Sequence, residues 1–290
     1  AALVFGGNPG SLTATEEFNT GVAIGAWSTG GDLNTGSLYR AGAGSLTAAL
    51  AFGGQPPVIA VTESYNGTSW TEVNDLNTAR GQLAGCGIQT AALGFGGTSA
   101  VAITETWNGT NWTEVNDLNT GRDRLAGAGT NTSALGFGGV PYTLGLTESW
   151  NGTNWTEVND LNTARYTLAG AGIQTAALAF GGDPGPTSAL TELWNGTNWT
   201  EVNDLNTARK VLAGAGIQTA ALAFGGQPTT GATETWNGTN WTETGDLNVP
   251  RAYLGGAGTN TAALAFGGSP TPAATEEWSD PGTIIKTITT

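Results

Sequence analysis

Residues 75–116 read DLNTARGQLAGCGIQTAALGFGGTSAVAITETWNGTNWTEVN, and most of the chain consists of close variants of this stretch. Its Phe-Gly-Gly tripeptide occurs seven times, at steps of 42 to 47 residues, beginning at Phe5, Phe52, Phe95, Phe137, Phe180, Phe224 and Phe266. A period in this range indicates copies of one supersecondary unit. Each residue is therefore either repeated scaffold or an exception, and we look for function among the exceptions.

Four short strands fit the unit, at residues 83–87, 91–96, 104–107 and 112–115. Ile-Gln-Thr turns the first strand into the second, and Asn-Gly turns the third into the fourth, as tight hairpins with positive φ prefer. Glycine and alanine in the first strand suit a crowded innermost position near a central axis. The Trp and Phe side chains of the outer strands suit packing between neighbouring units.

The pattern resembles the kelch repeat of galactose-oxidase-like β-propellers, in which hydrophobic residues lead into Gly-Gly and an aromatic residue follows on each of the next two strands. In two of the copies these places are filled by Gly53-Gly54, Tyr65 and Trp70, and by Gly181-Gly182, Trp194 and Trp199. The resemblance covers nearly the whole chain and implies an all-β propeller. Counting the strands of the repeats predicts that it has seven blades. The resemblance does not choose a function, because kelch propellers include both enzymes and binding modules.

Counting strands assigns residues 1–290 to one propeller domain. Complete four-stranded blades are predicted at residues 32–74, 75–116, 117–159, 160–203, 204–245 and 246–290, with residues 283–290 as the last strand. Residues 1–31 then give a first blade of only three strands. We expect incomplete closure, or a missing strand upstream, and the absence of Met suggests part of a longer product.

Composition excludes several classes of partner. The formal charge is −14, but most acidic residues recur in every unit, and only Asp123, Asp183 and Asp280 of the nine Asp are off register. This acidity favours solubility and argues against nucleic-acid binding. No apolar run approaches the roughly 18 residues of a membrane span, so we expect no membrane insertion. Cys86 stands where other copies have Ala, which predicts a small buried residue.

Histidine is absent, which removes Ser-His-Asp and Cys-His catalysis, histidine zinc sites and the copper site of galactose oxidase. A carbohydrate enzyme would need two off-register acids close together, for which Asp123 and Asp183 are the candidates. We expect no enzyme, no catalytic residue and no metal or other cofactor. Calcium bound by loop Asp and carbonyl oxygens stays an open alternative.

Five arginines share one register: Arg80, Arg122, Arg165, Arg209 and Arg251. Either they form a cationic ring that binds an anion, or each pairs with a repeated acid and fixes its own loop. Ser37 replaces the arginine in one unit, and Arg40 is the residue that could reach back to its place.

Two segments differ between otherwise similar copies. One joins the second and third strands, such as QPPVIAV from Gln55 or DPGPTSAL from Asp183, and the other is the residue pair before the first strand. Antiparallel order places both segments on one face and the repeated turns on the other. The predicted ligand-binding residues on the variable face are Tyr39, Gln82, Asp123, Arg124, Tyr142, Tyr166, Lys210 and Tyr253.

A face rich in Tyr suits protein or glycan recognition, although loops without function also vary. We therefore expect a non-enzymatic propeller within a larger chain or assembly, exposed at an extracellular or virion surface. The alternative is a structural spacer held through its rim or through the open edge of the three-stranded blade. A carbohydrate enzyme that uses carboxylates is the minor alternative.

Overall fold

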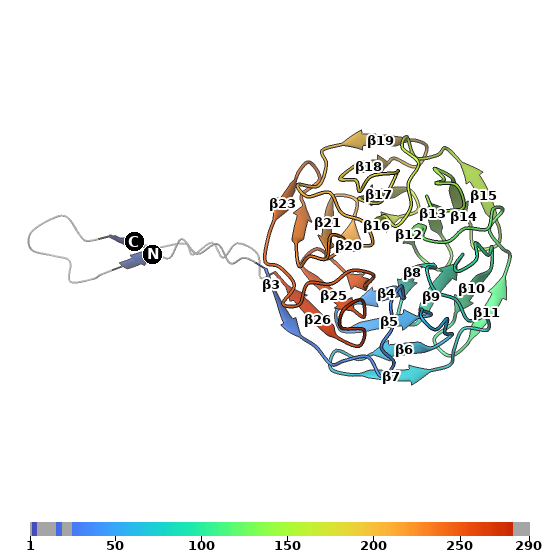
Figure 1. Ribbon diagram of the computed structural model, residues 1–290, viewed down its shortest axis with the longest axis horizontal. Helices are drawn as coiled ribbons and strands as arrows, with labels where there is room; N and C mark the ends of the chain where they lie inside the picture. Colours follow the sequence, from blue (N-terminus) through green and yellow to red (C-terminus); the bar gives the residue numbers. More distant parts are fainter. Residues whose placement is uncertain (1, 5–15, 19–24, 281–290) are drawn as a thin grey trace, which may run out of the picture.

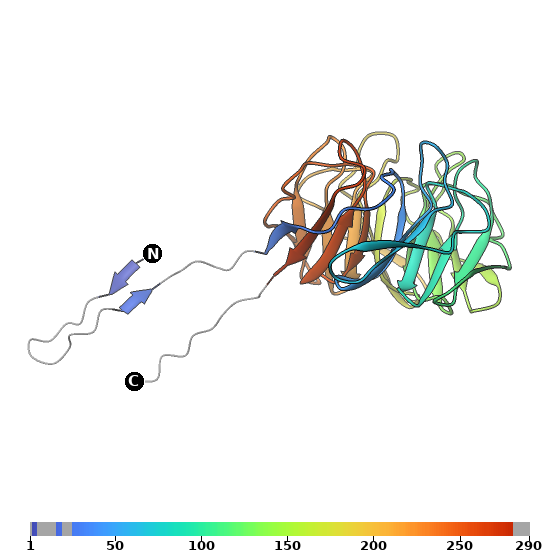
Figure 2. The same cartoon turned by 90° about the horizontal axis from the view of Figure 1, so that it is seen from below.

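Six four-stranded antiparallel sheets stand like blades around a central axis (Figure 1). This arrangement is seen in a computed structural model that describes residues 2–4, 16–18 and 25–280. We number the blades 1 to 6 in chain order. Figure 2 shows the propeller edge-on, with the strands running between its two faces.

The strands of blades 1 to 5 follow one another from the channel to the rim, and blade 6 has the order β24-β25-β26-β3. Blade 1 consists of β4 (Ala41–Ser45), β5 (Ala48–Phe52), β6 (Thr62–Tyr65) and β7 (Trp70–Val73). Blade 2 consists of β8 (Ala84–Ile88), β9 (Ala91–Phe95), β10 (Thr104–Trp107) and β11 (Trp112–Val115). Blade 3 consists of β12 (Ala126–Gly129), β13 (Ala134–Phe137), β14 (Thr147–Trp150) and β15 (Trp155–Val158). Blade 4 consists of β16 (Ala169–Ile173), β17 (Ala176–Phe180), β18 (Thr191–Trp194) and β19 (Trp199–Val202). Blade 5 consists of β20 (Ala213–Ile217), β21 (Ala220–Phe224), β22 (Thr233–Trp236) and β23 (Trp241–Glu243). Blade 6 consists of β24 (Gly255–Gly258), β25 (Ala262–Phe266), β26 (Thr275–Ser279) and β3 (Ala26–Thr29). The short strands β1 (Ala2–Val4) and β2 (Glu16–Phe18) pair with each other and belong to no blade.

The prediction of seven blades is wrong, and the position of β3 explains why. We expected this segment to be the fourth strand of a partial first blade, but it pairs with β26 and completes blade 6, with Trp27 opposite Trp278. The propeller thus closes between two segments far apart in sequence, and blade 1 has four strands like the others. Phe5 and the strand predicted at 283–290 lie outside the described residues. Since β3 fills the fourth position, the open blade edge expected for a spacer role is absent from residues 25–280.

Every pair of neighbouring blades is joined by the same tryptophan contact. The indole Nε1 of Trp112 on β11 donates a hydrogen bond to Thr62 Oγ1 of the preceding blade at 3.0 Å. The other five interfaces repeat this bond at the same length, from Trp27, Trp70, Trp155, Trp199 and Trp241. Trp27 therefore explains how the dissimilar segment of β3 substitutes for a regular fourth strand.

The buried core lies between the blades, in six clusters that each combine residues of two neighbouring blades. Small residues on the inner strands permit this packing. A Cβ added to Gly85 on β8 would lie 2.6 Å from Phe52 Cζ of the preceding blade. In each of the six described blades, the aromatic ring of the Phe-Gly-Gly tripeptide therefore requires glycine on the next inner strand.

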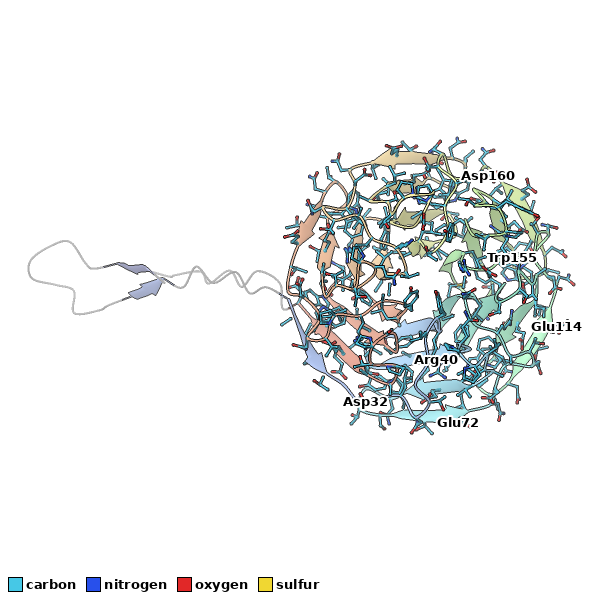
Figure 3. All side chains as sticks on the ribbon, in the orientation of Figure 1. Asp32, Arg40, Glu72, Glu114, Trp155 and Asp160 are labelled. Carbon is cyan, nitrogen blue, oxygen red and sulfur yellow. The ribbon has the colours of Figure 1, made fainter. Side chains whose placement is uncertain are left out.

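The arginines in register are buried, which contradicts the hypothesis of a cationic ring. Arg80 Nη2 lies 2.8 Å from Glu105 Oε1 on β10, and Arg80 Nη1 donates to the carbonyl oxygens of Gly96 and Ile103. Burial lowers the pKa of Arg80 from its ordinary value, and Glu105 opposes that change. Blades 3 to 6 repeat the pair. In blade 1, Arg40 takes the role from its different position and lies 2.8 Å from Glu63 (Figure 3 labels Arg40).

Candidate functional site

The two variable segments of each copy meet on one face, as their antiparallel connections predict. In five blades the first residue of the pair before the inner strand forms a β-bridge with the residue after Gly-Gly: Leu38 with Gln55, Asp123 with Val140, Tyr166 with Asp183, Lys210 with Gln227 and Ala252 with Ser269. In blade 2, the amide of Thr98 donates to the Gly81 carbonyl at 2.8 Å instead. We call this side of the propeller the variable face and the other side the turn face.

The second residue of each pair contributes to a closed ring around the axis, which we call the mouth ring. Its members are Tyr39, Gln82, Arg124, Thr167, Val211 and Tyr253, and all have left-handed φ between 50° and 63°. Each amide donates a hydrogen bond to the carbonyl of the equivalent residue in the preceding blade, at 2.8 to 3.2 Å. The ring closes because Tyr39 donates to Tyr253 at 2.9 Å. These hydrogen bonds hold one side chain from each of the six blades at the same level along the central axis.

A cavity of about 110 Å³ lies inside the mouth ring, at the end of the central channel. The residue after each ring member also lines it, and these residues are Arg40, Leu83, Leu125, Leu168, Leu212 and Leu254. The five leucines are buried and give the cavity an apolar wall. The ring members add two phenols, one amide, one guanidinium, one hydroxyl and one isopropyl group.

Polar side chains that line this cavity occupy four consecutive positions of the mouth ring, in blades 6, 1, 2 and 3. The rings of Tyr39 and Tyr253 lie 4.7 Å apart between centroids. Burial, together with the nearby Tyr253, raises the pKa of Tyr39 to about 12, so its hydroxyl stays protonated at neutral pH. The side chain of Arg124 is 38% exposed, with Nε 3.6 Å from Asp123 Oδ1 and its guanidinium carbon 5.9 Å from the centroid of the Tyr166 ring.

A second cluster lies on the variable face between blades 4 and 5. Asp183 Oδ2 accepts hydrogen bonds from Lys210 Nζ at 2.6 Å and from Tyr166 Oη at 3.3 Å, and Asp183 Oδ1 accepts one from the Gly185 amide. Burial would raise the pKa of Asp183, but the bonds from Lys210 and Gly185 hold it below its ordinary value. Asp183 correspondingly raises the pKa of Lys210. These three side chains fix the loop that follows β17.

The structure brings together only some of the predicted ligand-binding residues. Tyr39, Gln82, Arg124 and Tyr253 line the cavity, whereas Asp123, Tyr166 and Lys210 are first members of their pairs and lie outside its lining. Tyr142 is 93% exposed on the loop after β13 and is not part of the cavity. Sequence reasoning missed Thr167, Val211 and the leucines. The register of the second pair member would have identified Thr167 and Val211.

The cavity at the other end of the channel is lined almost entirely by residues without polar side chains. Glycine and alanine from all six inner strands line a second cavity there, also about 110 Å³, together with Cys86. Burial raises the pKa of the Cys86 thiol to about 12, so it stays protonated and weakly reactive.

Within the described ranges, no three His, Cys, Asp or Glu side chains form a group suited to a metal ion. The same part of the chain contains no helix of the length and apolarity required to cross a membrane.

Comparison with known proteins identifies the fold and leaves the function open. No protein-family model and no curated protein matches the sequence. The 607 chains of solved structures that match include the structure of YjhT, with a TM-score of 0.70 and 12% sequence identity, covering 87% of this chain and 96% of YjhT. At this identity the likeness shows a shared β-propeller fold. The finer assignment to the kelch repeat stays a prediction.

Proposed function

We propose that this protein is a non-catalytic binding propeller that recognises a protein or glycan through the mouth ring and its cavity. The observation that carries the proposal is the variety of residue types at the six positions of the mouth ring. Six positions with one backbone conformation hold five residue types, whereas the next position in register is Leu in five of six blades. Scaffold requirements alone would favour the same residue in every copy.

The backbone of the mouth ring adds a physical argument. A residue with a side chain in left-handed conformation costs roughly 1–2 kcal/mol, and glycine avoids that cost. The described chain uses glycine at 24 positive-φ positions, yet none of the six ring members is glycine. The other four positive-φ residues with side chains, Ser99, Ala100, Tyr142 and Thr143, also lie in variable segments. Strained residues that keep their side chains are typical of ligand sites.

The position of the chain connections also suits a binding role. Ala26 pairs with Ser279, so the chain enters β3 and leaves β26 side by side. Both points lie on the turn face, because β26 runs from a variable segment toward that face. Figure 1 shows β3 at the rim of the propeller. An attached assembly would thus leave the variable face exposed. This geometry fits our proposal of a recognition module on an extracellular or virion surface.

Two further features agree with the proposal. Asp123 lies beside Arg124 and Asp183 binds Lys210, so each of the two candidate catalytic acids is paired with a basic side chain.

We also propose that the blades are kelch repeats. Support comes from the positive φ of both residues of Gly53-Gly54 and of the equivalent pair in each other blade.

The test compares two triple variants on a glycan array and a peptide library. The mouth variant combines Tyr39→Ala, Arg124→Ala and Tyr253→Ala. The matched control combines Ile88→Ala, Ile173→Ala and Ile217→Ala, three residues that are at least half exposed at strand ends on the turn face. We expect probes that bind the wild type and the control to bind the mouth variant at least about tenfold more weakly. Equal binding by all three proteins would contradict the proposal.

A further inference from the structure

The mouth cavity has two chemically different sides, and this difference bears on what it selects. Hydrogen-bonding side chains of Tyr253, Tyr39, Gln82 and Arg124 come from the four consecutive blades 6, 1, 2 and 3. Blades 4 and 5 contribute only Thr167 and Val211 to the ring. Thr167 Oγ1 donates to the Tyr166 carbonyl at 2.7 Å. Together with the leucine wall, the ring therefore presents donors at four consecutive positions and mainly aliphatic surface at the other two.

Arg124 differs from every other arginine among residues 25–280. The other six each place a guanidinium nitrogen within 3.0 Å of a buried glutamate. The side chain of Arg124 makes no hydrogen bond to a described residue, because its nearest carboxylate oxygen, Asp123 Oδ1, lies 3.6 Å from Nε. Asp123 therefore orients the guanidinium and offsets part of its charge, while the two terminal nitrogens keep their donors for a ligand.

The remaining polar groups reinforce this preference for an acceptor. Burial raises the pKa of Tyr39 to about 12, so its hydroxyl stays protonated and can donate a hydrogen bond to an acceptor. None of the residues that line the cavity is acidic. The repeated glutamates of the fourth strands, such as Glu72 and Glu114, lie at the outer rim instead (Figure 3). An anion can therefore approach the mouth without facing a carboxylate in the cavity wall.

The size of the cavity limits the ligand group that enters it. An apolar cavity of roughly 150 Å³ accommodates benzene in a protein core. The mouth cavity of about 110 Å³ is smaller, so a group of about four to six non-hydrogen atoms fits. This size matches a carboxylate with a one- to three-carbon aliphatic group.

We propose that the mouth cavity selects a carboxylate carried on a short aliphatic group. The carboxylate binds Arg124 and the tyrosine hydroxyls, since guanidinium and carboxylate form paired charge-assisted hydrogen bonds. The aliphatic part packs against Val211 and Leu212. This inference rests on the proposed function and names its ligand chemistry, which a free short-chain acid or the C-terminal residue of a peptide can supply.

The experiment is a ligand-observed NMR titration of the full chain with butyrate and with its neutral isostere butyramide. A parallel pair of probes is a tetrapeptide ending in Val with a free or an amidated C-terminus. We expect the free carboxylate of at least one pair to bind about tenfold more tightly than its amide. Arg124→Gln should abolish that preference. Lys210→Gln, which removes a cation already bound by Asp183 outside the cavity, should preserve it.

The outcomes separate this inference from the proposed function. Tighter binding of butyrate than of its amide identifies a free acid as the source, and a preference confined to the peptide pair identifies a chain terminus. Equal binding of acids and amides that the mouth variant abolishes would overturn the carboxylate inference and support the mouth as a binding site. If none of the four probes binds, the inference is overturned. The glycan array and peptide library then test the proposed function independently.

Discussion

At the scale of single residues, the pKa values of the two off-register aspartates on the variable face are shifted in opposite directions. The pKa of Asp123 is raised, because burial outweighs the effect of Arg124. The pKa of Asp183 is lowered, because Lys210 and the Gly185 amide bind its charged form more strongly than burial disfavours it. Asp183 therefore stabilises the fold when ionised, whereas ionised Asp123 opposes it.

The first prediction follows from this contrast. Asp183→Asn should lower the melting temperature near neutral pH by about 2–8 °C, which corresponds to about 1–2 kcal/mol for a charged hydrogen-bonded group. Because the folded-state pKa lies below the ordinary 3.8, the contribution of Asp183 is complete above that pH and is lost as the pH falls through the lower folded value. The difference from wild type should therefore shrink below about pH 4 in a series of thermal melts.

Asp123→Asn provides the matched control with the opposite sign. A raised folded-state pKa contributes stability at low pH that is lost as the pH rises through it. At neutral pH, Asp123→Asn should therefore leave the melting temperature unchanged or raise it. A similar loss in both variants would show that the two carboxylates do not differ in this way.

The residue scale also explains how much of the site the sequence could predict. Tyr39, Gln82, Arg124 and Tyr253 stand out because their side chains are unusual among near-identical copies. Thr167 and Val211 have ordinary side chains, so only their register in the repeat, and not their residue type, marks them as members of the backbone ring. Tyr166 and Lys210 look equally distinctive, but the bridging position turns them toward Asp183.

At the scale of strands, repetition made the local structure predictable. The four strands expected at residues 83–87, 91–96, 104–107 and 112–115 correspond to β8, β9, β10 and β11 within one residue at each end. β3 was likewise expected to be a fourth strand, and it is one. The sequence did not indicate its partner, because pairing between distant strands depends on how many blades close the ring.

The second prediction concerns the inner strands, where space decides the residue. Gly85→Ala should place a Cβ 2.6 Å from Phe52 Cζ and 3.0 Å from Ala41 Cβ. Such overpacking costs about 1–3 kcal/mol, so we expect the melting temperature to fall by roughly 2–12 °C. Differential scanning calorimetry of the purified chain measures this change.

Cys86→Ala is the matched control for that prediction, because it changes the neighbouring residue of β8 to the Ala found in the other blades. It should shift the melting temperature by less than about 3 °C. If Gly85→Ala is as stable as Cys86→Ala, close packing between inner strands does not explain the repeated glycine.

At the scale of the whole molecule, closure depends on one short strand. β3 supplies four residues to blade 6, and Trp27 packs 5.0 Å from Phe224 and 5.4 Å from Trp278 between ring centroids. The interface between blades 6 and 1 also has a pair found at no other interface of the described chain: Tyr65 Oη donates to Glu277 Oε1 at 2.5 Å. Tyr65 stands where the other blades carry Trp, so two exceptions in the repeat meet where the ring closes.

The third prediction tests this closure by comparing two truncations. Removing residues 1–24 keeps β3, whereas removing residues 1–31 deletes it and exposes β26, Trp278 and Thr233. Loss of the Trp27 packing alone costs about 3–5 kcal/mol, so the longer truncation should melt roughly 6–20 °C below the shorter one. It should also self-associate in analytical ultracentrifugation, since an unpaired strand edge can pair with another chain. In a seven-bladed ring, the two truncations would differ only within an already incomplete blade. Equal stability and a monomeric state for both would contradict six-blade closure through β3.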